Sequence, residues 1–206
     1  SLHRLGIQCT VVESAEEVLP LGVGINLLPH AVRELDALGL LKQLESMSVA
    51  PTMLGYFSAH GQPIWSESRG RAAGYAWPQL SIHRGTLQTT LWNEAERRLG
   101  TEHLLSGHEV VEVSSSQHNA RVLARRRSDG STAELACEVA IAADGIHSAV
   151  RRQFLPDEGM PKWNGALLWR GALERAPILD GRTMVWAGHP DQKFVAYPIL
   201  DLPNGH

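Results

Sequence analysis

The stretch from residue 138 to residue 152 places the strongest constraint on what this 206-residue chain can fold into. Its first part, Val139–Ala143, is an unbroken run of small apolar residues flanked by charge, too short for a helix, which predicts a strand buried on both faces. Asp144 and Gly145 then form a turn signal, and Ser148 is suited to cap a short helix. A strand, a tight turn and a helix in this order are typical of an open parallel sheet, where a nucleotide binds beyond the carboxyl ends of the strands.

The first residues predict the second half of a βαβ unit. Residues 1–6 look like the last turns of a helix closed by Gly6, and Ile7–Val12 predicts a strand that ends at Glu13. A dinucleotide-binding fold hydrogen-bonds a ribose with an acidic residue at this place, about 20 residues after its glycine-rich turn. An ordinary surface carboxylate is the alternative for Glu13, and its place in a series with Asp144 favours the ribose role.

Residues 20–40 combine two glycines with the start of a helix. Gly22 and Gly24 allow backbone conformations closed to other residues, or a close approach to a flat ligand. A turn without a ligand is the alternative. Pro29 opens a helix whose apolar residues recur at helical spacing up to Gly39.

The next segments predict a second layer and another helix. Leu54–Ser58 and Gln62–Trp65 predict a hairpin, residues 66–75 a polar loop, and Pro78–Leu91 a short strand that runs into a helix. Arg84 lies at the start of that helix, where a guanidinium and the helix dipole both favour an anion such as a pyrophosphate. A salt-bridged surface arginine is the alternative.

The second half of the chain is rich in short strand patterns. An antiparallel meander is expected over Val110–Val113, Ala120–Arg127 and Thr132–Leu135. After Pro156, β-branched and aromatic residues suit a sheet with one face over a flat ligand. Its expected strands are Ala166–Leu173, Thr183–Ala187 and Phe194–Ile199.

Charge and cysteine content exclude several classes of protein. The formal net charge of -3 predicts no attraction to nucleic acid or to an anionic membrane surface. No apolar stretch reaches the length of a membrane span, and no secretory leader is expected. Cys9 and Cys137 lie in or beside apolar runs, which predicts two small buried thiols in a reducing cytoplasm. The ten histidines show no metal-ligand spacing, so no metal site is expected.

Three segments carry a resemblance to a known family. Ala143–Arg151, Ala-Asp-Gly-x-x-Ser-x-Val-Arg, resembles the Asp-Gly motif of the FAD-dependent aromatic hydroxylases, which are single-component flavoprotein monooxygenases with a para-hydroxybenzoate-hydroxylase-like fold. Pro20–Leu40 resembles the flavin-ring loop of that family, and His83–Leu91 resembles its His-Arg-x-x-Leu-x-x-x-Leu helix start. Within this family, Pro20–Pro29 together with Trp65–Glu67, Arg69–Gly70 and Pro78–Gln88 looks most like the phenazine-carboxylate monooxygenase branch.

The resemblance implies an α/β fold: a partial Rossmann-like FAD-binding domain with an antiparallel β-meander, plus the start of a β-sheet substrate domain. Residues 1–52 and 83–158 are then parts of the FAD-binding domain. Residues 53–82 form an excursion of the substrate domain, and residues 159–206 begin its sheet. The first βα turn and roughly the last half of a family member are expected to lie outside this sequence, so the segment alone is expected to be inactive.

The resemblance also implies a cofactor, a reaction and a set of contacts. FAD is the expected cofactor, with NADH or NADPH and O2 as co-substrates, and a small aromatic or N-heteroaromatic carboxylic acid is hydroxylated through a flavin hydroperoxide. Tyr197 is the candidate for a substrate contact, and His147 is expected to have no chemical role. The candidate cofactor contacts are Glu13, Ser14, Gly22, Val23, Gly24, Ile25, Arg84, Val110, Asp144 and Gly145.

Two alternatives stay open at this point. One is another NAD(P)H/FAD oxidoreductase, or a nicotinamide dehydrogenase, on a related two-domain fold. The other is a non-catalytic protein with the same FAD fold. A yellow protein that consumes O2 with NAD(P)H would argue against the dehydrogenase, and a G-x-G-x-x-G about 20 residues before Glu13 would argue against the non-catalytic protein.

Overall fold

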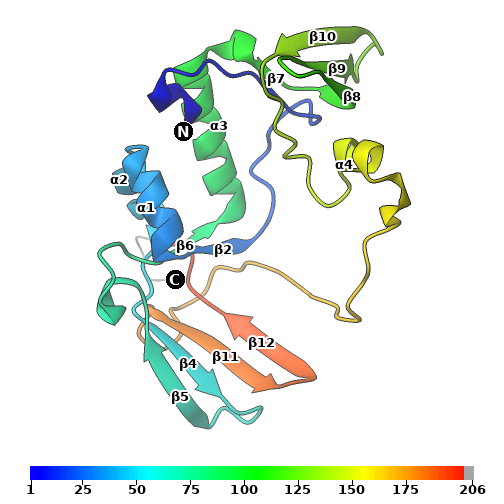
Figure 1. Ribbon diagram of the computed structural model, residues 1–206. Coiled ribbons are helices and arrows are strands. Elements are labelled where there is room, and N and C mark those ends of the chain that lie inside the picture. The colour runs from blue at the N-terminus through cyan, green and yellow to red at the C-terminus, as the bar shows by residue number, and fades with distance from the viewer. Residues whose placement is uncertain (202–206) are drawn as a thin grey trace. The chain divides into compact units, whose positions relative to one another are not determined.

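The computed structural model describes residues 1–201, which form a mixed α/β structure with several sheets and two compact units (Figure 1). Unit 1 comprises Ser1–Val18 and Leu91–Trp169, and unit 2 comprises Leu19–Thr90 and the chain from Arg170 onward. The division of the chain into residues 1–52, 53–82, 83–158 and 159–206 stays a prediction. Residues 202–206 of the last segment lie outside the described residues.

Unit 1 is built around a three-stranded antiparallel sheet, which confirms the predicted meander. The strands stand in the order β10-β9-β8 and are β8 (His108–Ser115), β9 (Ala120–Arg126) and β10 (Thr132–Cys137). Val113, Ala120 and Ala124 are its buried side chains, and a register shift interrupts β8 between Val110 and Glu112. Unit 1 also holds the second part of the long helix Arg84–Leu99 and six short elements: η1 (Leu2–Leu5), β1 (Val11–Val12), η3 (Thr101–His103), β7 (Leu104–Leu105), α4 (Ala149–Phe154) and η4 (Pro156–Glu158).

The expected strand over Ile7–Val12 is wrong for most of its length. Only Val11 and Val12 form a strand, β1, which pairs in parallel with the two residues of β7. A strand extends only as far as its hydrogen-bonding neighbour, and β7 begins only at Leu104, directly after the 3₁₀ helix η3, so residues 7–10 have no partner strand there among the described residues. The expected helix end does appear, as the 3₁₀ helix η1 closed by Gly6 in a left-handed conformation with φ of 73°.

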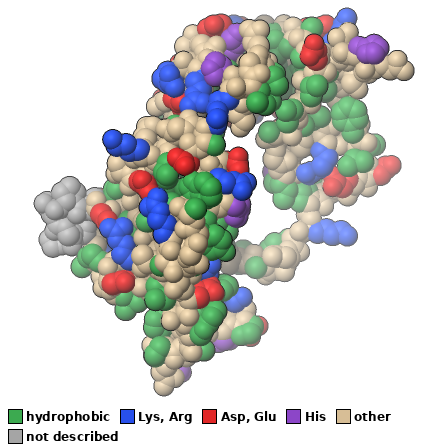
Figure 2. All heavy atoms as spheres, turned by 60° about the vertical axis from the view of Figure 1, so that its left-hand side comes forward, with side chains coloured by type: hydrophobic (Ala, Val, Ile, Leu, Met, Phe, Trp, Pro, Cys, Tyr) green, Lys and Arg blue, Asp and Glu red, His purple; other side chains and the backbone are tan. Residues whose placement is uncertain are grey.

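The expected buried strand over Val139–Ala143 is also wrong. These residues are coil, and Val139 and Ile141 are each 73% exposed. A strand buried on both faces needs hydrogen-bonded neighbours and covering layers, and within residues 1–201 no strand pairs with this segment. The expected strand over Ala166–Leu173 fails for the same reason, with Trp169 92% exposed in coil. In Figure 2, apolar side chains, drawn in green, are visible at many places on the surface.

Unit 2 contains two sheets. The larger has the order β12-β11-β4-β5 and confirms the predicted hairpin and the two later strands; its members are β4 (Met53–Phe57), β5 (Pro63–Ser68), β11 (Thr183–His189) and β12 (Gln192–Ala196). β11 runs parallel to β4, and the other neighbours are antiparallel. The short helix η2 (Gly70–Ala73) occupies part of the expected loop 66–75.

The smaller sheet of unit 2 supports the core. Its order is β2-β6-β3, with β2 (Gly24–Leu27), β3 (Ser48–Val49) and β6 (Leu80–His83). The helices of this region are α1 (Pro29–Ala37), α2 (Leu41–Glu45) and the first part of α3 (Arg84–Leu99), which continues into unit 1 from Leu91. As predicted, Pro29 stands in the first turn of α1, and Gly39 follows the helix with φ of 77°. One cluster of buried residues joins the helices to the sheet: Val32, Leu40, Leu44, Leu80 and Ile82. Burial of each of these side chains contributes about 1.5–3 kcal/mol.

Cys9 and Cys137, which were expected to be buried, are partly exposed free thiols. None of the helices found among residues 1–201 is long and apolar enough to cross a membrane. In the same residues, no three His, Cys, Asp or Glu side chains come together as metal ligands would.

Candidate functional site

In unit 2, the loop Pro20–Gly24 lies against the junction of β6 and α3. Gly24, the first residue of β2, pairs with His83, the last residue of β6. The backbone N–H of Arg84 donates to the carbonyl oxygen of Val23 at 2.8 Å. The antiparallel pairing of β2 with β6 therefore brings the loop to the first turn of α3.

Arg84 and Gly22 are in direct contact at this junction. Gly22 has φ of 119°, and a Cβ atom there would lie 2.6 Å from Nε of Arg84. Nη2 of Arg84 donates to the carbonyl oxygen of Leu21 at 3.4 Å. The Arg84 side chain is exposed, and no ion pair of the described residues includes it, so its charge is not neutralised. The alternative, a surface arginine in a salt bridge, needs a carboxylate partner, and none of the described residues supplies one.

The residues on either side of Arg84 also hold the loop. Nε2 of His83 lies 2.9 Å from the carbonyl oxygen of Gly22, and because a carbonyl only accepts, that nitrogen carries the proton. A Cβ atom at Gly85 would lie 2.1 Å from the carbonyl carbon of Pro20. Only glycine at position 85 permits this approach.

Two residues from the end of the described chain reach the same loop. A Cβ atom on Gly24 would lie 2.7 Å from Cε2 of Tyr197. Nη2 of Arg170 donates to the carbonyl oxygen of Gly24 at 2.9 Å. Tyr197 and Arg170 thus both contact Gly24, one with its ring and one with its charged end.

We call this arrangement the glycine-loop site: Pro20–Gly24, His83, Arg84, Gly85, Arg170 and Tyr197. It brings together the sequence-predicted residues Gly22, Val23, Gly24, Arg84 and Tyr197, and Ile25 follows in β2. Sequence reasoning missed His83, Gly85 and Arg170. The positions of His83 and Gly85 directly beside Arg84 could have identified them. Nothing in the local sequence around Arg170 predicts its contact with Gly24, which lies 146 positions away.

In unit 1, Glu13 stands at the end of β1 as predicted, and its side chain binds the following turn. Oε1 accepts hydrogen bonds from the backbone N–H of Ala15 at 2.7 Å and from the hydroxyl of Ser14 at 3.3 Å. The backbone of Glu13 continues the pairing with Leu105 and His108. Val110, another predicted contact, lies in β8 at the register shift.

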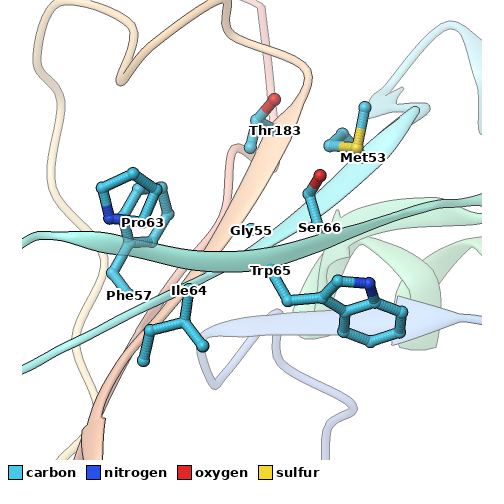
Figure 3. A pocket seen from close by; sticks show the side chains of 8 residues that line it. All are labelled: Met53, Gly55, Phe57, Pro63, Ile64, Trp65, Ser66 and Thr183. Atoms are coloured by element: carbon cyan, nitrogen blue, oxygen red, sulfur yellow. The ribbon is translucent and has the colours of Figure 1, made fainter.

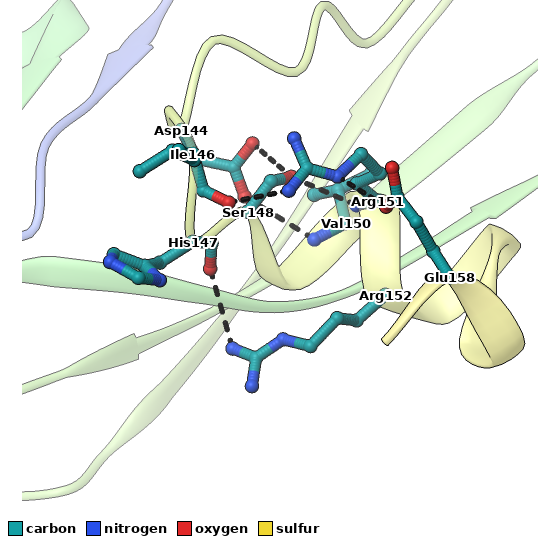
Figure 4. A network of polar contacts seen from close by, with 8 residues as sticks. All are labelled: Asp144, Ile146, His147, Ser148, Val150, Arg151, Arg152 and Glu158. Carbon is teal, nitrogen blue, oxygen red and sulfur yellow. Dashed lines mark hydrogen bonds and ion pairs between the residues drawn. The ribbon is translucent and has the colours of Figure 1, made fainter. Parts of the chain in front are cut away.

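Asp144 is the centre of a small polar network at the start of α4 (Figure 4). Its carboxylate accepts hydrogen bonds from the hydroxyl of Ser148 at 2.5 Å and from the backbone N–H of Val150 at 3.3 Å. Partial burial acts to raise the pKa of Asp144, but these hydrogen bonds outweigh it and lower the pKa below its usual value. Asp144 is therefore ionised at neutral pH.

The rest of this segment fixes the Asp144 turn in place. Ser148 is the predicted N-cap of α4, and its oxygen accepts from the backbone N–H of Arg151 at 2.8 Å. Gln153, which sequence reasoning missed, joins α4 to β8: its amide oxygen and nitrogen bond the N–H and carbonyl of Val113 at 3.0 and 2.6 Å. Gly145 has φ of 76°, and the side chain of His147 is exposed.

Each unit also has a shallow hollow. The hollow of unit 1, of about 420 Å³, lies beside Arg151 and Glu158 and is lined by Ile146, Arg151, Glu158 and Gly159–Lys162. The hollow of unit 2, of about 360 Å³, lies on the β4–β5–β11 sheet and is lined by Met53, Gly55, Phe57, Pro63, Ile64, Trp65, Ser66 and Thr183. In Figure 3 the side chains of Ser66 and Trp65 point to opposite sides of β5.

Comparison with known proteins places these sites in context. Residues 1–197 match the family model described as FAD binding domain. Phenazine 1,6-dicarboxylic acid hydroxylase of Lysobacter antibioticus is 39% identical over 201 residues, which are 96% of this chain and 49% of that protein. 3-Hydroxybenzoate 6-hydroxylase of Klebsiella oxytoca is 27% identical over 206 residues, 97% of this chain and 50% of that protein.

Among solved structures, HpxO from Klebsiella pneumoniae, complexed with FAD and uric acid, has a similar fold. Its TM-score is 0.69 at 19% sequence identity, over 96% of this chain and 49% of that chain. The chain spans about half the length of the curated relatives it matches.

Proposed function

Because the chain belongs to the FAD binding domain family, we propose that the protein is an FAD-dependent monooxygenase that hydroxylates an aromatic or N-heteroaromatic carboxylic acid with NADH or NADPH and O2. The names of two relatives support this substrate class, since one is a phenazine dicarboxylic acid hydroxylase and the other a hydroxybenzoate hydroxylase. The proposed compartment is the cytoplasm, which the free thiols of Cys9 and Cys137 support.

One observation carries the proposal for the cofactor: the guanidinium of Arg84, which has no ion-pair partner among residues 1–201, lies at the first turn of α3 against the backbone of Gly22. A guanidinium binds phosphate oxygens bidentately, and the N-terminus of a 16-residue helix adds a favourable dipole. The glycine-loop site therefore fits the diphosphate of FAD. We assign the contact with the flavin ring to the backbone of Gly22–Ile25, which carries no side chain at Gly22 and Gly24. Arg84 and Tyr197 fill the space beside these two glycines.

In unit 1, we assign the ribose and the remaining cofactor contacts to Glu13, Ser14, Val110, Asp144 and Gly145. Glu13 has one carboxylate oxygen tied to the Ser14–Ala15 turn, and a ribose hydroxyl can donate to the other. Asp144 is ionised, and its charge is fixed by Ser148 and Val150. Both carboxylates are therefore oriented before any cofactor binds.

FAD, when bound, supplies the electron transfer from the nicotinamide to O2. The residues of this chain supply binding and orientation. The ring of Tyr197 packs on Gly24, so an aromatic compound that contacts Tyr197 lies beside the glycine loop. Arg170 holds the carbonyl of Gly24 from the same part of the unit, which fixes the loop against the ring.

Two measurements on the full-length protein test the proposal. Flavin fluorescence titration gives the affinity for FAD, and NAD(P)H oxidation is then followed with and without 3-hydroxybenzoate or phenazine-1-carboxylate. Faster oxidation with one of these acids, together with a hydroxylated product, is the expected result. Absence of FAD binding, or oxidation at one rate whatever aromatic acid is added, would contradict the assignment.

A further inference from the structure

A row of aromatic side chains crosses the larger sheet of unit 2. The strand register places Trp65 of β5 opposite Tyr56 of β4, and Tyr56 opposite Trp186 of β11. Residues that stand opposite one another on neighbouring strands point to the same face of a sheet. The ring centroids of Tyr56 and Trp65 are 5.4 Å apart, and those of Tyr56 and Trp186 are 5.3 Å apart, so the three rings form a continuous surface.

This aromatic row is open to solvent. Trp65 is 59% exposed and Trp186 is 37% exposed, and Val195 of β12, which continues the row beyond Trp186, is exposed as well. Contiguous apolar surface of this kind marks a binding site more often than isolated exposed side chains do. Aromatic faces of this type bind flat aromatic compounds by offset or edge-to-face stacking.

The two ends of the row differ in charge. At the β5 end, Glu67 forms an ion pair with Arg69 and accepts a hydrogen bond from the hydroxyl of Tyr56 at 3.2 Å, so the positive charge there is neutralised. At the β12 end, Lys193 stands two residues before Val195 and therefore on the same face. Its Nζ lies 5.6 Å from the ring centroid of Trp186. Within the part of the chain that the structure describes, Lys193 belongs to no ion pair.

We propose that this face binds the planar aromatic acid, with the ring stacked on Trp186 and Trp65 and the carboxylate paired with Nζ of Lys193. The inference rests on the proposed function and goes further, because it assigns the preference for an acid over a neutral aromatic compound to one side chain. The charge difference also fixes the orientation: the carboxylate end of the ligand lies toward β12, because only that end of the row carries an uncompensated cation among the described residues.

The test compares phenazine-1-carboxylate with its neutral isostere phenazine-1-carboxamide. Binding to the FAD-loaded protein is measured by tryptophan fluorescence quenching at fixed ionic strength. Lys193→Met keeps an apolar side chain of similar length and removes the charge, and the Kd of the acid is expected to rise about three- to tenfold. The Kd of the amide is expected to stay unchanged, and Lys193→Arg is expected to keep the preference for the acid.

Two further variants make the result specific. Lys42→Met on α2 removes the same charge from an exposed site in the same unit and is expected to leave both Kd values unchanged. Trp186→Leu removes the stacking surface and is expected to weaken the acid and the amide alike. The proposal is overturned if Lys193→Met leaves the acid unaffected or shifts both ligands equally, or if Lys42→Met reproduces its effect.

Failure of this inference is distinguishable from failure of the proposed function. A parent protein that binds FAD and oxidises NAD(P)H faster with an aromatic acid, but fails the Lys193 comparison, keeps its function and loses only the assignment of specificity. A parent protein that binds neither FAD nor the phenazines loses both.

Discussion

A methyl group on Gly22 would lie 2.6 Å from Nε of Arg84. The loop and the guanidinium therefore share one space, which they can occupy together only because residue 22 has no side chain. Since the guanidinium is the far end of a flexible side chain, a methyl group at position 22 would displace Arg84 more readily than it would unfold the loop. The position of Arg84 at the first turn of α3 thus depends on the glycine.

The first prediction uses this dependence. Gly22→Ala is expected to weaken FAD binding about tenfold, because the displaced guanidinium loses a charge-assisted contact. Its backbone strain, from φ of 119°, is expected to lower the free energy of unfolding by about 1 kcal/mol. Gly74→Ala is the matched control, because Gly74 has φ of 89° and, among residues 1–201, only its chain neighbours lie within 4 Å of the place that a Cβ atom would take. Both variants are expected to lose similar stability, but only Gly22→Ala is expected to lose FAD affinity. If the two variants bind FAD equally well, Arg84 does not contact the cofactor.

The second prediction concerns Arg84 itself. Arg84→Ala is expected to raise the Kd for FAD by about one to two powers of ten, and Arg84→Lys is expected to recover only part of the loss because an ammonium cannot bind phosphate bidentately. Arg33→Ala on α1 is the control, since Arg33 pairs with its neighbour Glu34 on the surface. Isothermal titration gives the values. If Arg84→Ala and Arg33→Ala bind FAD equally well, the diphosphate contact lies elsewhere.

Local signals in the sequence predicted the elements whose hydrogen bonds are local. Pro29 and the apolar residues after it gave α1, and the alternating pattern of residues 110–135 gave the meander. Val139–Ala143 has an equally strong apolar pattern and is nevertheless exposed coil. A strand buried on both faces is defined by its neighbours, and no pattern within the segment says whether a neighbour is present.

The same difference between local signals and distant contacts applies to the residues of the candidate site. Glu13 and Arg84 were recognisable as candidates because each stands at a strand or helix end. Gly22 was recognisable because a second glycine, Gly24, follows it before the strand β2. Arg170 was not, because its contact with Gly24 depends on the path of the chain between two distant residues. Equally, the sequence could not show that Lys193 has no ion-pair partner among residues 1–201, because this depends on which carboxylates the fold leaves out of reach.

The third prediction concerns pH and stability in α3. Hydrogen bonds from Arg97 and Arg98, at 2.7 and 2.6 Å, lower the pKa of Glu94 from 4.5 to about 2 against the opposing effect of burial. Because the folded pKa lies below the unfolded one, ionised Glu94 stabilises the native state above about pH 4.5, and this contribution is lost as the pH falls to about 2.

Glu94→Gln is therefore expected to lower the free energy of unfolding at pH 7 by about 0.5–1 kcal/mol, a value kept small because Arg97 is exposed and solvent screens the pair. The difference from the parent is expected to vanish near pH 2. Glu96→Gln, a change at an exposed neighbour, serves as the control. Urea unfolding across this pH range provides the measurement, and a difference that does not vary with pH would argue against the ion pairs.

The last prediction separates two roles of Asp144. Asp144→Asn keeps the shape of the side chain and one oxygen acceptor for Ser148 or Val150, but removes the charge near the start of α4. The free energy of unfolding is expected to fall by about 0.5–1 kcal/mol. If the carboxylate also takes part in FAD binding, the Kd for FAD is expected to rise about tenfold, which is the size of a charge-assisted hydrogen bond.

Ser148→Ala is the control that distinguishes the two roles. It removes the hydroxyl that donates to Asp144 and accepts from the N–H of Arg151, so it weakens the same turn but leaves the carboxylate in place. Ser148→Ala is therefore expected to lose stability and keep its FAD affinity, whereas Asp144→Asn loses both. Thermal unfolding of the FAD-free protein and FAD titration measure the two effects separately. If both variants lose FAD affinity to the same extent, Asp144 acts only by shaping the turn, and the cofactor contact assigned to its charge is wrong.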